Sequence, residues 1–301
     1  MKKKIVVALG GNALLQRGQV LSAENQYQNI AVAAQALAEL SQEYRVILVH
    51  GNGPQVGLLA LQNQAYQEVP AYPLDILVAQ TQGMVGYMLA QSLSALAQMP
   101  PVTTVVTRVV VDAQDEAFER PAKFIGPVYR LEQKDELQQR WGWHMKTDGQ
   151  YLRRVVASPQ PQRIVELDTI DRLQQQGQLV ICCGGGGAPV FAEGAHYYGA
   201  EAVIDKDLAA SLLARQLNAD HLMILTDADA VYQDWGTPQQ RALRCVTPEQ
   251  LYPFAGDDGS MGPKAQAAID FVRDTGRNAY IGALSDATAI LAGDRGTCVR
   301  A

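Results

Sequence analysis

The sequence predicts an α/β protein with helices on both sides of a mainly parallel sheet. Three short apolar segments run directly into glycine, at residues 5–11, 46–51 and 179–184. A buried parallel strand has a continuous apolar sequence, and glycine at its carboxyl end lets a ligand approach the bare backbone. Three such junctions predict a doubly wound fold that holds a phosphate-rich ligand at one edge of its sheet.

In the first half of the chain, apolar strands alternate with helices. Ser22 is a suitable N-cap for a helix that continues to Glu43 with apolar residues at helical spacing. Pro54 suits the first turn of the next helix, and Pro100 follows the end of a longer one. The expected strands cover residues 5–9, 46–49 and 102–111, and the expected helices cover 23–43, the residues after 54, and about 74–97.

The same alternation returns in the second half. Helices are expected near 167–176, 208–217 and 261–275, and strands at 179–183, 221–225 and 279–281, before a last helix and strand. Residues from about 112 to 161 instead carry charges, turn residues and aromatic patches with little period. We therefore expect one domain over residues 1–301, with 112–161 as an inserted flap outside the sheet.

The composition excludes several classes of protein. An apolar content of 48% with 19% charged residues is typical of a globular chain. The net charge of -6 and the lack of a basic stripe argue against a nucleic-acid partner. No run reaches the ~20 apolar residues of a membrane span, and residues 5–9 are too short for the core of a signal peptide. We expect a cytoplasmic protein.

The cysteines indicate neither zinc nor disulfides. The four cysteines have no zinc-ligand spacing and form no C-x-x-C pair. Cys182 and Cys183 are adjacent in an expected strand, so their side chains should lie on opposite faces as small buried hydrophobes. We expect no metal bound by protein side chains alone, and a reducing compartment.

Glycine and lysine are the residues that indicate chemistry. The chain has no G-x-x-x-x-G-K-[ST] and no G-x-G-x-x-G sequence, which excludes P-loop and Rossmann nucleotide sites. Phosphoryl transfer needs hydrogen-bond donors and cations around the moving group. The turns Gly10-Gly11-Asn12 and Gly51-Asn52-Gly53 can supply backbone and asparagine donors. Tight turns without a ligand remain the alternative for either one alone.

Two lysines lie at expected helix starts. Lys206 lies between two aspartates, and Asp207 is placed to cap the helix or to interact with its dipole. Lys264 follows the small residues 259–262 in an arrangement that can bind an anion. A surface capping cluster and a plain N-terminal cap, respectively, are the alternatives.

Two further segments are weaker candidates. Thr226 and Asp227 follow an expected strand, where α/β folds place ligands, although a capped turn is the alternative. Magnesium would more often arrive with nucleotide phosphates than bind the nearby aspartates. Lys123 lies in the irregular stretch, and by itself would be taken as a solvated loop lysine.

In their order along the chain, these motifs closely resemble those of the carbamate kinases, members of the amino acid kinase family. The matching segments cover nearly the whole chain at residues 7–14, 50–57, 121–127, 183–190, 201–208 and 259–264. The resemblance implies a three-layer αβα sandwich around a mainly parallel sheet, with a small protruding subdomain, in a homodimer. It also implies reversible phosphoryl transfer between ATP and carbamate, with Mg²⁺ on the nucleotide.

The resemblance implies a role for each matching residue. Lys206 and Lys264 would neutralise charge on the phosphoryl group, Lys123 would reach in from the flap, and Asp207 would orient Lys206. The residues that would hold the phosphoryl group and carbamate are Gly10, Gly11, Asn12, Gly51, Asn52 and Gly53. The residues that would line the nucleotide side are Thr226, Asp227, Tyr232 and Met261, with Lys264.

The chain departs from the usual carbamate kinase pattern in three places. It has Ala122 and Phe124 around Lys123, Gln150 to Leu152 before two arginines, and Ala230 before Val231. The first two changes lie in the flap, where closure or substrate choice would differ. These variants resemble the carbamate kinases of allantoin and purine breakdown, which form ATP.

Two other functions remain open from the sequence. The same fold could phosphorylate acetylglutamate, aspartate or a nucleoside monophosphate, although the flap lysine motif argues against this. A non-catalytic sensor of carbamoyl phosphate or nucleotide would not need the full set of lysines.

Overall fold

An eight-stranded sheet forms the centre of the protein in the computed structural model, which describes residues 2–16, 18–256 and 260–301. Its strands, in spatial order, are β15 (Cys245–Val246), β17 (Thr297–Val299), β16 (Ala279–Ala283), β12 (His221–Thr226), β1 (Lys3–Leu9), β2 (Tyr44–His50), β9 (Leu179–Ile181) and β3 (Val102–Thr104). Only β16 and β17 pair antiparallel, so the prediction of a mainly parallel sheet is confirmed.

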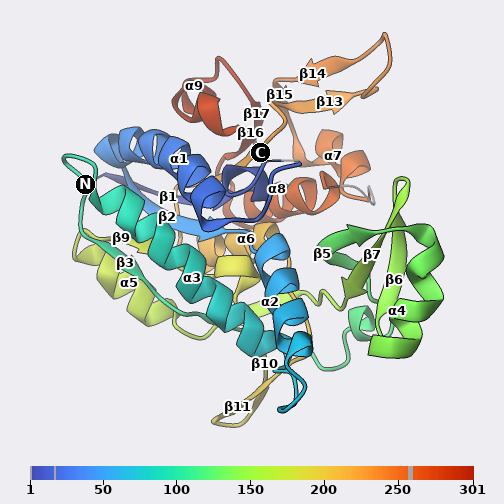
Figure 1. The fold of residues 1–301 in the computed structure, drawn as a ribbon. Helices are drawn as coiled ribbons and strands as arrows, with labels where there is room; N and C mark the ends of the chain where they lie inside the picture. Colours follow the sequence, from blue (N-terminus) through green and yellow to red (C-terminus); the bar gives the residue numbers. More distant parts are fainter. Residues whose placement is uncertain (1, 17, 257–259) are drawn as a thin grey trace.

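Helices cover both faces of this sheet (Figure 1). One face packs against α1 (Ala23–Glu43), α3 (Leu74–Ser94) and α9 (Ala287–Ala292), and the other packs against α5 (Leu167–Gln175), α6 (Lys206–Gln216) and α8 (Gly262–Thr275). Along β1, Val6 and Ala8 enter one apolar cluster, whereas Val7 and Leu9 enter the other. This burial on both sides explains the continuous apolar sequence of the strand and confirms the three-layer prediction.

The predicted helix starts are present. The Ser22 hydroxyl accepts a hydrogen bond from the Asn25 N–H over 3.2 Å and caps α1. Pro54 lies in the first turn of α2 (Gly53–Ala65). The 3-10 turns η1 (Gly11–Ala13) and η4 (Gly184–Gly186) follow β1 and β9.

The prediction of a single strand over residues 102–111 is wrong. The structure has β3 in the central sheet and β4 (Arg108–Val111) in a second sheet with β11 (His196–Gly199), β10 (Ala188–Glu193) and β8 (Pro161–Ile164). The Gln82 side chain accepts from the Thr107 N–H over 2.9 Å and donates to the Thr107 carbonyl over 3.0 Å. These bonds occupy the backbone between the two strands, where the chain leaves one sheet for the other.

The stretch expected to be irregular contains regular structure. The antiparallel strands β5 (Lys123–Tyr129), β7 (Tyr151–Val156) and β6 (His144–Asp148) form a third sheet, which carries α4 (Lys134–Trp141). We call residues 121–157 the side unit, because Figure 1 shows this sheet and helix standing to one side of the body, next to α2. Its small core contains Leu137, Trp143, Met145 and Leu152. That this unit is a separate inserted subdomain remains a prediction.

The side unit approaches α2 through two glycines. A Cβ atom on Gly57 would lie 2.0 Å from the Cα of Gly126. The helix and β5 therefore touch backbone to backbone, which only glycine permits at position 57.

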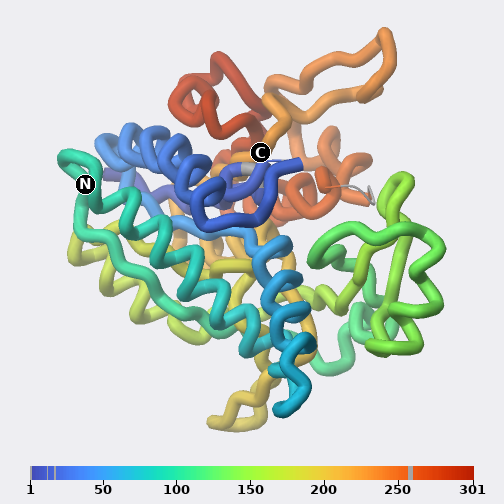
Figure 2. Tube along the Cα trace, viewed as in Figure 1, coloured from blue at the N-terminus to red at the C-terminus, as the bar shows by residue number. Residues whose placement is uncertain are grey.

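Two hairpins were not expected from the sequence. The pair β10–β11 and the pair β13 (Val231–Gln233) and β14 (Arg241–Leu243) extend from the body in Figure 2. The remaining short elements are α7 (Pro248–Leu251), η2 (Glu116–Phe118), η3 (Leu131–Gln133), η5 (Tyr252–Phe254) and η6 (Leu284–Asp286).

The two adjacent cysteines differ from their prediction in one respect. Both are buried, as expected, but β9 ends at Ile181 and Cys183 has a left-handed backbone with φ of 50°. Because the strand has ended, their side chains do not alternate, and both lie in the same apolar cluster. No helix within the described residues is long and apolar enough to cross a membrane.

Candidate active site

The predicted glycine turns lie side by side at one edge of the central sheet. The parallel register places Leu9 opposite both His50 and Leu225, so Gly10 and Gly51, which follow β1 and β2, lie level with Thr226, the last residue of β12. The Gly10 N–H donates to the Leu225 carbonyl over 2.8 Å, and the Gly51 N–H donates to the Leu9 carbonyl over 3.2 Å. These two N–H groups therefore extend the sheet and are not the donors that a ligand would use.

The next residues in each turn do offer such donors. Neither the Gly11 nor the Asn52 N–H donates a hydrogen bond to a group in the described ranges. A Cβ on Gly51 would lie 3.8 Å from the Gly11 nitrogen and 3.4 Å from the Cδ of Lys206. The bare backbone at Gly51 thus brings both turns close to the lysine side chain.

A buried cluster of lysines and aspartates lies beside these turns. The Lys206 Nζ donates to Oδ1 of Asp207 over 2.6 Å, and the Lys264 Nζ donates to Oδ2 of the same carboxylate over 3.2 Å. Lys123, from the first position of β5, forms an ion pair with Asp205. The structure therefore brings together all four residues predicted to be catalytic, from β5, α6 and α8.

Local folding explains where these side chains lie. The Asp205 carboxylate accepts from the Asp207 N–H over 2.8 Å and caps α6, so Lys206 and Asp207 fall in its first turn. Lys264 lies in the first turn of α8 and also donates to the Ser260 carbonyl over 2.9 Å. Both helices present their N-terminal, partially positive ends to the cluster.

The electrostatics of the cluster favour an anionic ligand. Burial lowers the pKa of the Lys206 ammonium, against the attraction of Asp207. Burial also disfavours charge on Lys264, but Asp207 and Asp205 outweigh it and raise the pKa of Lys264. Burial would raise the pKa of Asp205, yet Lys123 and Lys206 hold it below its usual range. Within the cluster, three ammonium groups thus pair with two carboxylates, and Asp227 attracts Lys264 from outside it.

The glycine run after β9 packs closely against His50 and the Gly51-Asn52-Gly53 turn. A Cβ on Gly184 would lie 2.3 Å from Nε2 of His50, and one on Gly185 would lie 2.1 Å from the Asn52 amide. The Asn52 amide donates to the Thr81 hydroxyl over 2.8 Å. Burial lowers the pKa of His50 to about 4, so its imidazole is neutral at neutral pH. The glycine run therefore fixes Asn52 and His50 rather than forming a turn of its own at the site.

The other residues predicted for phosphoryl binding are less well defined. Gly53 begins α2, and a Cβ there would meet nothing within 4 Å. Asn12 lies in η1, and its side chain falls outside the described part of the molecule. Gly259, the first residue of the motif that ends at Lys264, also lies outside the described residues.

The predicted nucleotide residues do not all lie together. Thr226 and Asp227 line a cavity of about 450 Å³, which the ends of β12 and β16 form with η1. Tyr232 and Met261 are not among its lining residues. The Tyr232 hydroxyl donates to Asp229 over 2.7 Å, and Met261 packs against the apolar core at the start of α8. Lys264, the fifth of these residues, does not line it either, so the structure brings two of the five to one cavity.

The unusual residues of the flap lie in the side unit. The Ala122 N–H donates to the Val156 carbonyl over 3.2 Å, and the Phe124 ring lies 5.4 Å from the Arg153 guanidinium. Gln150 belongs to the turn between β6 and β7, followed by exposed Tyr151 and buried Leu152. The changes therefore lie along the sheet that carries Lys123.

Sequence reasoning gave no role to two residues of the site. The sequence places Asp205 beside Lys206, but its pairing with Lys123 joins positions 82 residues apart. His50 precedes the Gly-Asn-Gly turn, and this histidine at the end of an apolar strand was the available signal. No group of three or more histidine, cysteine or acidic side chains that could hold a metal is found in the described ranges.

Comparison with known proteins agrees with this geometry. The model of the amino acid kinase family matches residues 3–283. The chain is 64% identical over 297 residues to a carbamate kinase of Escherichia coli strain K12, covering 99% of each chain. It is 51% identical over 300 residues to a carbamate kinase of Rhizobium meliloti, covering 98% of this chain and 93% of that protein.

A solved structure extends the similarity to the whole fold. The carbamate kinase of Giardia lamblia, in a structure with citric acid bound, superposes with a TM-score of 0.94 at 40% identity and covers 99% of this chain and 98% of its own. Sequence and fold thus agree over nearly the full length. The chain belongs to the amino acid kinase family, among the carbamate kinases.

Proposed function

We propose that this protein transfers a phosphoryl group reversibly between ATP and carbamate, and that it works mainly from carbamoyl phosphate and ADP toward ATP. The Lys206–Asp207–Lys264 cluster beside Gly11 and Gly51 carries this proposal. It combines positive charge with unused backbone donors, which are what phosphoryl transfer requires. The 64% identity to a protein named carbamate kinase supports the choice of substrate.

In the proposed reaction, charge stabilisation replaces acid–base chemistry. The N–H groups of Gly11 and Asn52 and the ammonium groups of Lys206 and Lys264 surround the transferring phosphoryl group. Asp207 holds both ammonium groups in place, and Lys123 closes the site from the side unit. Carbamate is already an anion, so its attack on ATP in the reverse direction needs no general base. The carbamate released in the ATP-forming direction then decays to CO₂ and ammonia.

The nucleotide and its metal complete the proposal. The cavity next to Thr226 and Asp227 is our candidate for part of the nucleotide site, supported by a related Giardia carbamate kinase whose structure contains AMP-PNP. Asp205 and Asp207 are already paired with lysines, so the cluster suits phosphate oxygens better than a metal ion. Mg²⁺ would be held by the nucleotide phosphates and would supply further positive charge there.

Three wider expectations belong to the same proposal. A homodimer is supported by the family resemblance and by exposed apolar side chains such as Tyr66 and Tyr198, which are 61% and 51% exposed. A cytoplasmic site of action fits the four free cysteines. The flap variants at Ala122 and Phe124 support membership of the allantoin and purine group.

A single assay tests the proposed reaction. Carbamoyl phosphate, ADP and Mg²⁺ should yield ATP, and Lys206→Ala should lower the rate by about 10²- to 10³-fold, or ~3–4 kcal/mol. Lys146→Ala, at an exposed position on β6, is the matched control and should retain the wild-type rate. Absence of ATP above background would refute the proposal, and a normal rate in Lys206→Ala would refute the role of that lysine.

The same assay separates the alternatives. Faster ATP formation from the acyl phosphate of acetylglutamate or aspartate, or from a nucleoside diphosphate, than from carbamoyl phosphate would indicate another kinase of this fold. Tight binding of carbamoyl phosphate without turnover would indicate a sensor.

A further inference from the structure

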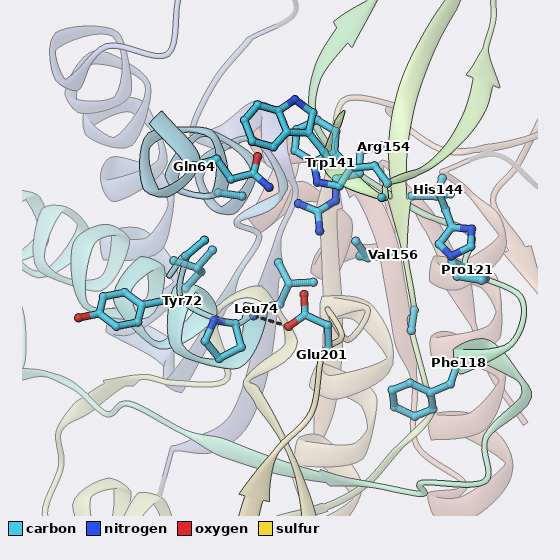
Figure 3. Close-up of a pocket in the computed structure, with 18 residues that line it drawn as sticks. Gln64, Tyr72, Leu74, Phe118, Pro121, Trp141, His144, Arg154, Val156 and Glu201 are labelled. Atoms are coloured by element: carbon cyan, nitrogen blue, oxygen red, sulfur yellow. Dashed lines mark hydrogen bonds between the residues drawn. The ribbon is translucent and has the colours of Figure 1, made fainter. Parts of the chain in front are cut away.

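A second cavity, of about 660 Å³, lies between the body and the side unit (Figure 3). The body contributes Gln64 near the end of α2, Tyr72 before α3, and Glu201. The side unit contributes Trp141 and Arg154. None of the glycine turns or clustered lysines lines this space, so it is separate from the candidate active site.

The contact between α2 and β5 separates the two sites. The backbones meet at Gly57 and Gly126. Asn52 lies at the start of α2, in the candidate active site. Gln64 lies near the other end of the same helix, in the second cavity. A ligand in one site would therefore not occupy the other.

Arg154 is the main polar feature of the cavity. Figure 3 shows its guanidinium pointing into the space, toward the carboxylate of Glu201. It lies 4.7 Å from the centre of the Trp143 ring, but it makes no hydrogen bond or ion pair with any residue in the described ranges. Burial lowers the pKa of this guanidinium, and Glu201 opposes that shift. An arginine keeps its charge even so, and this half-buried guanidinium, which faces the cavity without an acceptor, can pair with an anion there.

The neighbouring Arg153 differs from Arg154 in its hydrogen bonds. That guanidinium donates to Asp148 over 3.0 Å and to the Gly126 carbonyl over 3.2 Å. The two terminal nitrogens of Arg153 thus have acceptors inside the side unit, although its buried Nε has none. The adjacent Arg154 donates none of its nitrogens to a group in the described ranges.

A second polar atom in the cavity also lacks a partner. The side-chain oxygen of Gln64 is buried and accepts no hydrogen bond. Glu201 already accepts from the Leu74 N–H over 2.8 Å (dashed in Figure 3). Buried polar atoms normally have partners, so the Gln64 oxygen indicates that another group occupies this space, where Arg154 offers hydrogen-bond donors.

The remaining walls define the shape of the occupant. Tyr72, Phe118 and Trp141 contribute aromatic surface, which suits a flat apolar group. One guanidinium faces one carboxylate, and the negative charge of Glu201 would repel a doubly charged phosphate ester. A singly charged acid fits this balance better.

We propose that this cavity is a binding site for a small organic acid, whose carboxylate pairs with Arg154 and whose flat apolar group packs against the aromatic walls. The acid would touch both the body and the side unit. Val156, which lines the cavity, is the register partner of Lys123 on the neighbouring strand. Occupancy would therefore alter how Lys123 is held, and this consequence for the rate rests on the proposed function.

Direct binding tests the site without any turnover. The probe is 3-phenylpropionate, and the signal is tryptophan fluorescence, because Trp141 and Trp143 line the cavity. We expect saturable binding in the millimolar range, as is usual for a ligand of about ten heavy atoms. The uncharged 3-phenylpropionamide should bind at least about ten-fold more weakly, because it cannot pair with Arg154.

Matched variants locate the probe. Arg154→Gln should weaken binding by about ten-fold or more, and Arg153→Gln should leave it within about two-fold. Tyr72→Ala provides a test at low risk to folding, since this side chain is 54% exposed, and it should also weaken binding.

Several results would overturn the site. These are no saturable signal, equal binding of the acid and the amide, equal effects of the two arginine variants, and displacement of the probe by carbamoyl phosphate or AMP-PNP. A bound probe that leaves KM and kcat for ATP formation unchanged would overturn the link to Lys123. Because binding is measured directly, failure of the proposed function would appear separately, as missing ATP formation without the probe.

Discussion

Lys264, in the first turn of α8, donates a hydrogen bond over 3.2 Å to Oδ2 of Asp207, in the first turn of α6. The other oxygen of that carboxylate accepts from Lys206 over 2.6 Å. One buried carboxylate thus holds two ammonium groups that would otherwise repel each other. This arrangement keeps both lysines charged and close together at the candidate phosphoryl site.

Asp207→Asn should move the alkaline limb of the pH–rate profile to lower pH. Burial lowers the pKa of Lys206, and Asp207 opposes it; the same carboxylate supports the raised pKa of Lys264. Without that charge both pKa values fall, so the ammonium forms are lost at lower pH than in the wild type. Measuring kcat/KM for ATP formation between about pH 6 and pH 10 checks this.

The control for this variant is a surface aspartate. Asp274 pairs with Arg215, and its side chain is 54% exposed. Asp274→Asn should leave the profile unchanged, because exposed pairs contribute little. An Asp207→Asn profile that overlays the wild-type curve would show that Asp207 does not set the charge of the lysines.

Gly185→Ala should displace Asn52 and reduce activity. The backbone at Gly185 has φ of 63°, and a Cβ there would lie 2.1 Å from the Asn52 amide. Asn52 would have to leave its bond to Thr81, and its N–H would shift with it. We expect kcat for ATP formation to fall by about 10²-fold, as for loss of one transition-state donor.

Gly194→Ala separates this effect from backbone strain. Gly194 has φ of 59°, but a Cβ there would meet nothing within 4 Å. Both variants should lose about 1 kcal/mol of stability from the left-handed backbone, and Gly185→Ala should lose more because its Cβ also overlaps Asn52. Urea unfolding measures both losses. If the two lose activity equally, the contact between Gly185 and Asn52 has no catalytic importance.

The central sheet could be predicted because its strands are buried on both faces. In β1, residues 5–9 alternate between two apolar clusters, so each of these positions is apolar and the pattern is visible without knowledge of the neighbouring strands. The strands of the side unit lack this signal. Met145 is buried, whereas the flanking His144 and Lys146 are exposed, and the short strand is interrupted by polar residues.

The other features that the sequence did not predict depend on contacts between residues far apart in the chain. The break after β3 depends on the Gln82 side chain, which bonds both backbone groups of Thr107. The pairing of Lys123 with Asp205 joins residues far apart in the chain. β-branched residues continue through the break after β3, so periodicity does not indicate it. Periodicity also carries no information on a pair of residues so far apart in the chain. Lys206 and Lys264 could be predicted, since each lies at a motif that the sequence displays, whereas the role of Lys123 depended on the family resemblance.

Gly57→Ala should force α2 and β5 apart and weaken the hold on Lys123. The added Cβ would lie 2.0 Å from the Cα of Gly126, and that backbone cannot move aside as a side chain would. We expect a stability loss of about 1–3 kcal/mol from overpacking and a clear fall in kcat/KM for ATP formation. Urea unfolding and steady-state kinetics measure the two effects.

Gly83→Ala is the matched helical control. Gly83 lies within α3, and a Cβ there would meet nothing within 4 Å. Alanine should therefore stabilise the protein by up to about 1 kcal/mol through its better helix propensity. Equal kinetics in the two variants would argue that the contact of α2 with β5 does not position Lys123.

The buried His50 should make the folded protein less stable in acid. Its Nδ1 lies 2.9 Å from the Gly51 carbonyl, which can only accept, so Nδ1 carries the proton of the neutral ring. Burial lowers the pKa from 6.5 to about 4. Between these values the unfolded chain binds a proton at His50 that the folded protein does not, so the free energy of unfolding falls as the pH decreases. The free energy of unfolding loses nothing through His50 above about pH 6.5, and the loss reaches about 3 kcal/mol at pH 4.

His50→Asn should remove that part of the pH dependence. An asparagine amide can replace Nδ1–H as the donor to Gly51, but it does not titrate. Urea unfolding at about pH 4.5 and pH 7 should therefore show a smaller difference in His50→Asn than in the wild type. His196→Asn changes an exposed histidine on β11 and should retain the wild-type difference. Carboxylates titrate in the same range, but they are common to all three proteins, so the comparison isolates His50. An unchanged difference in His50→Asn would mean that the buried imidazole accepts a proton as readily as the unfolded one.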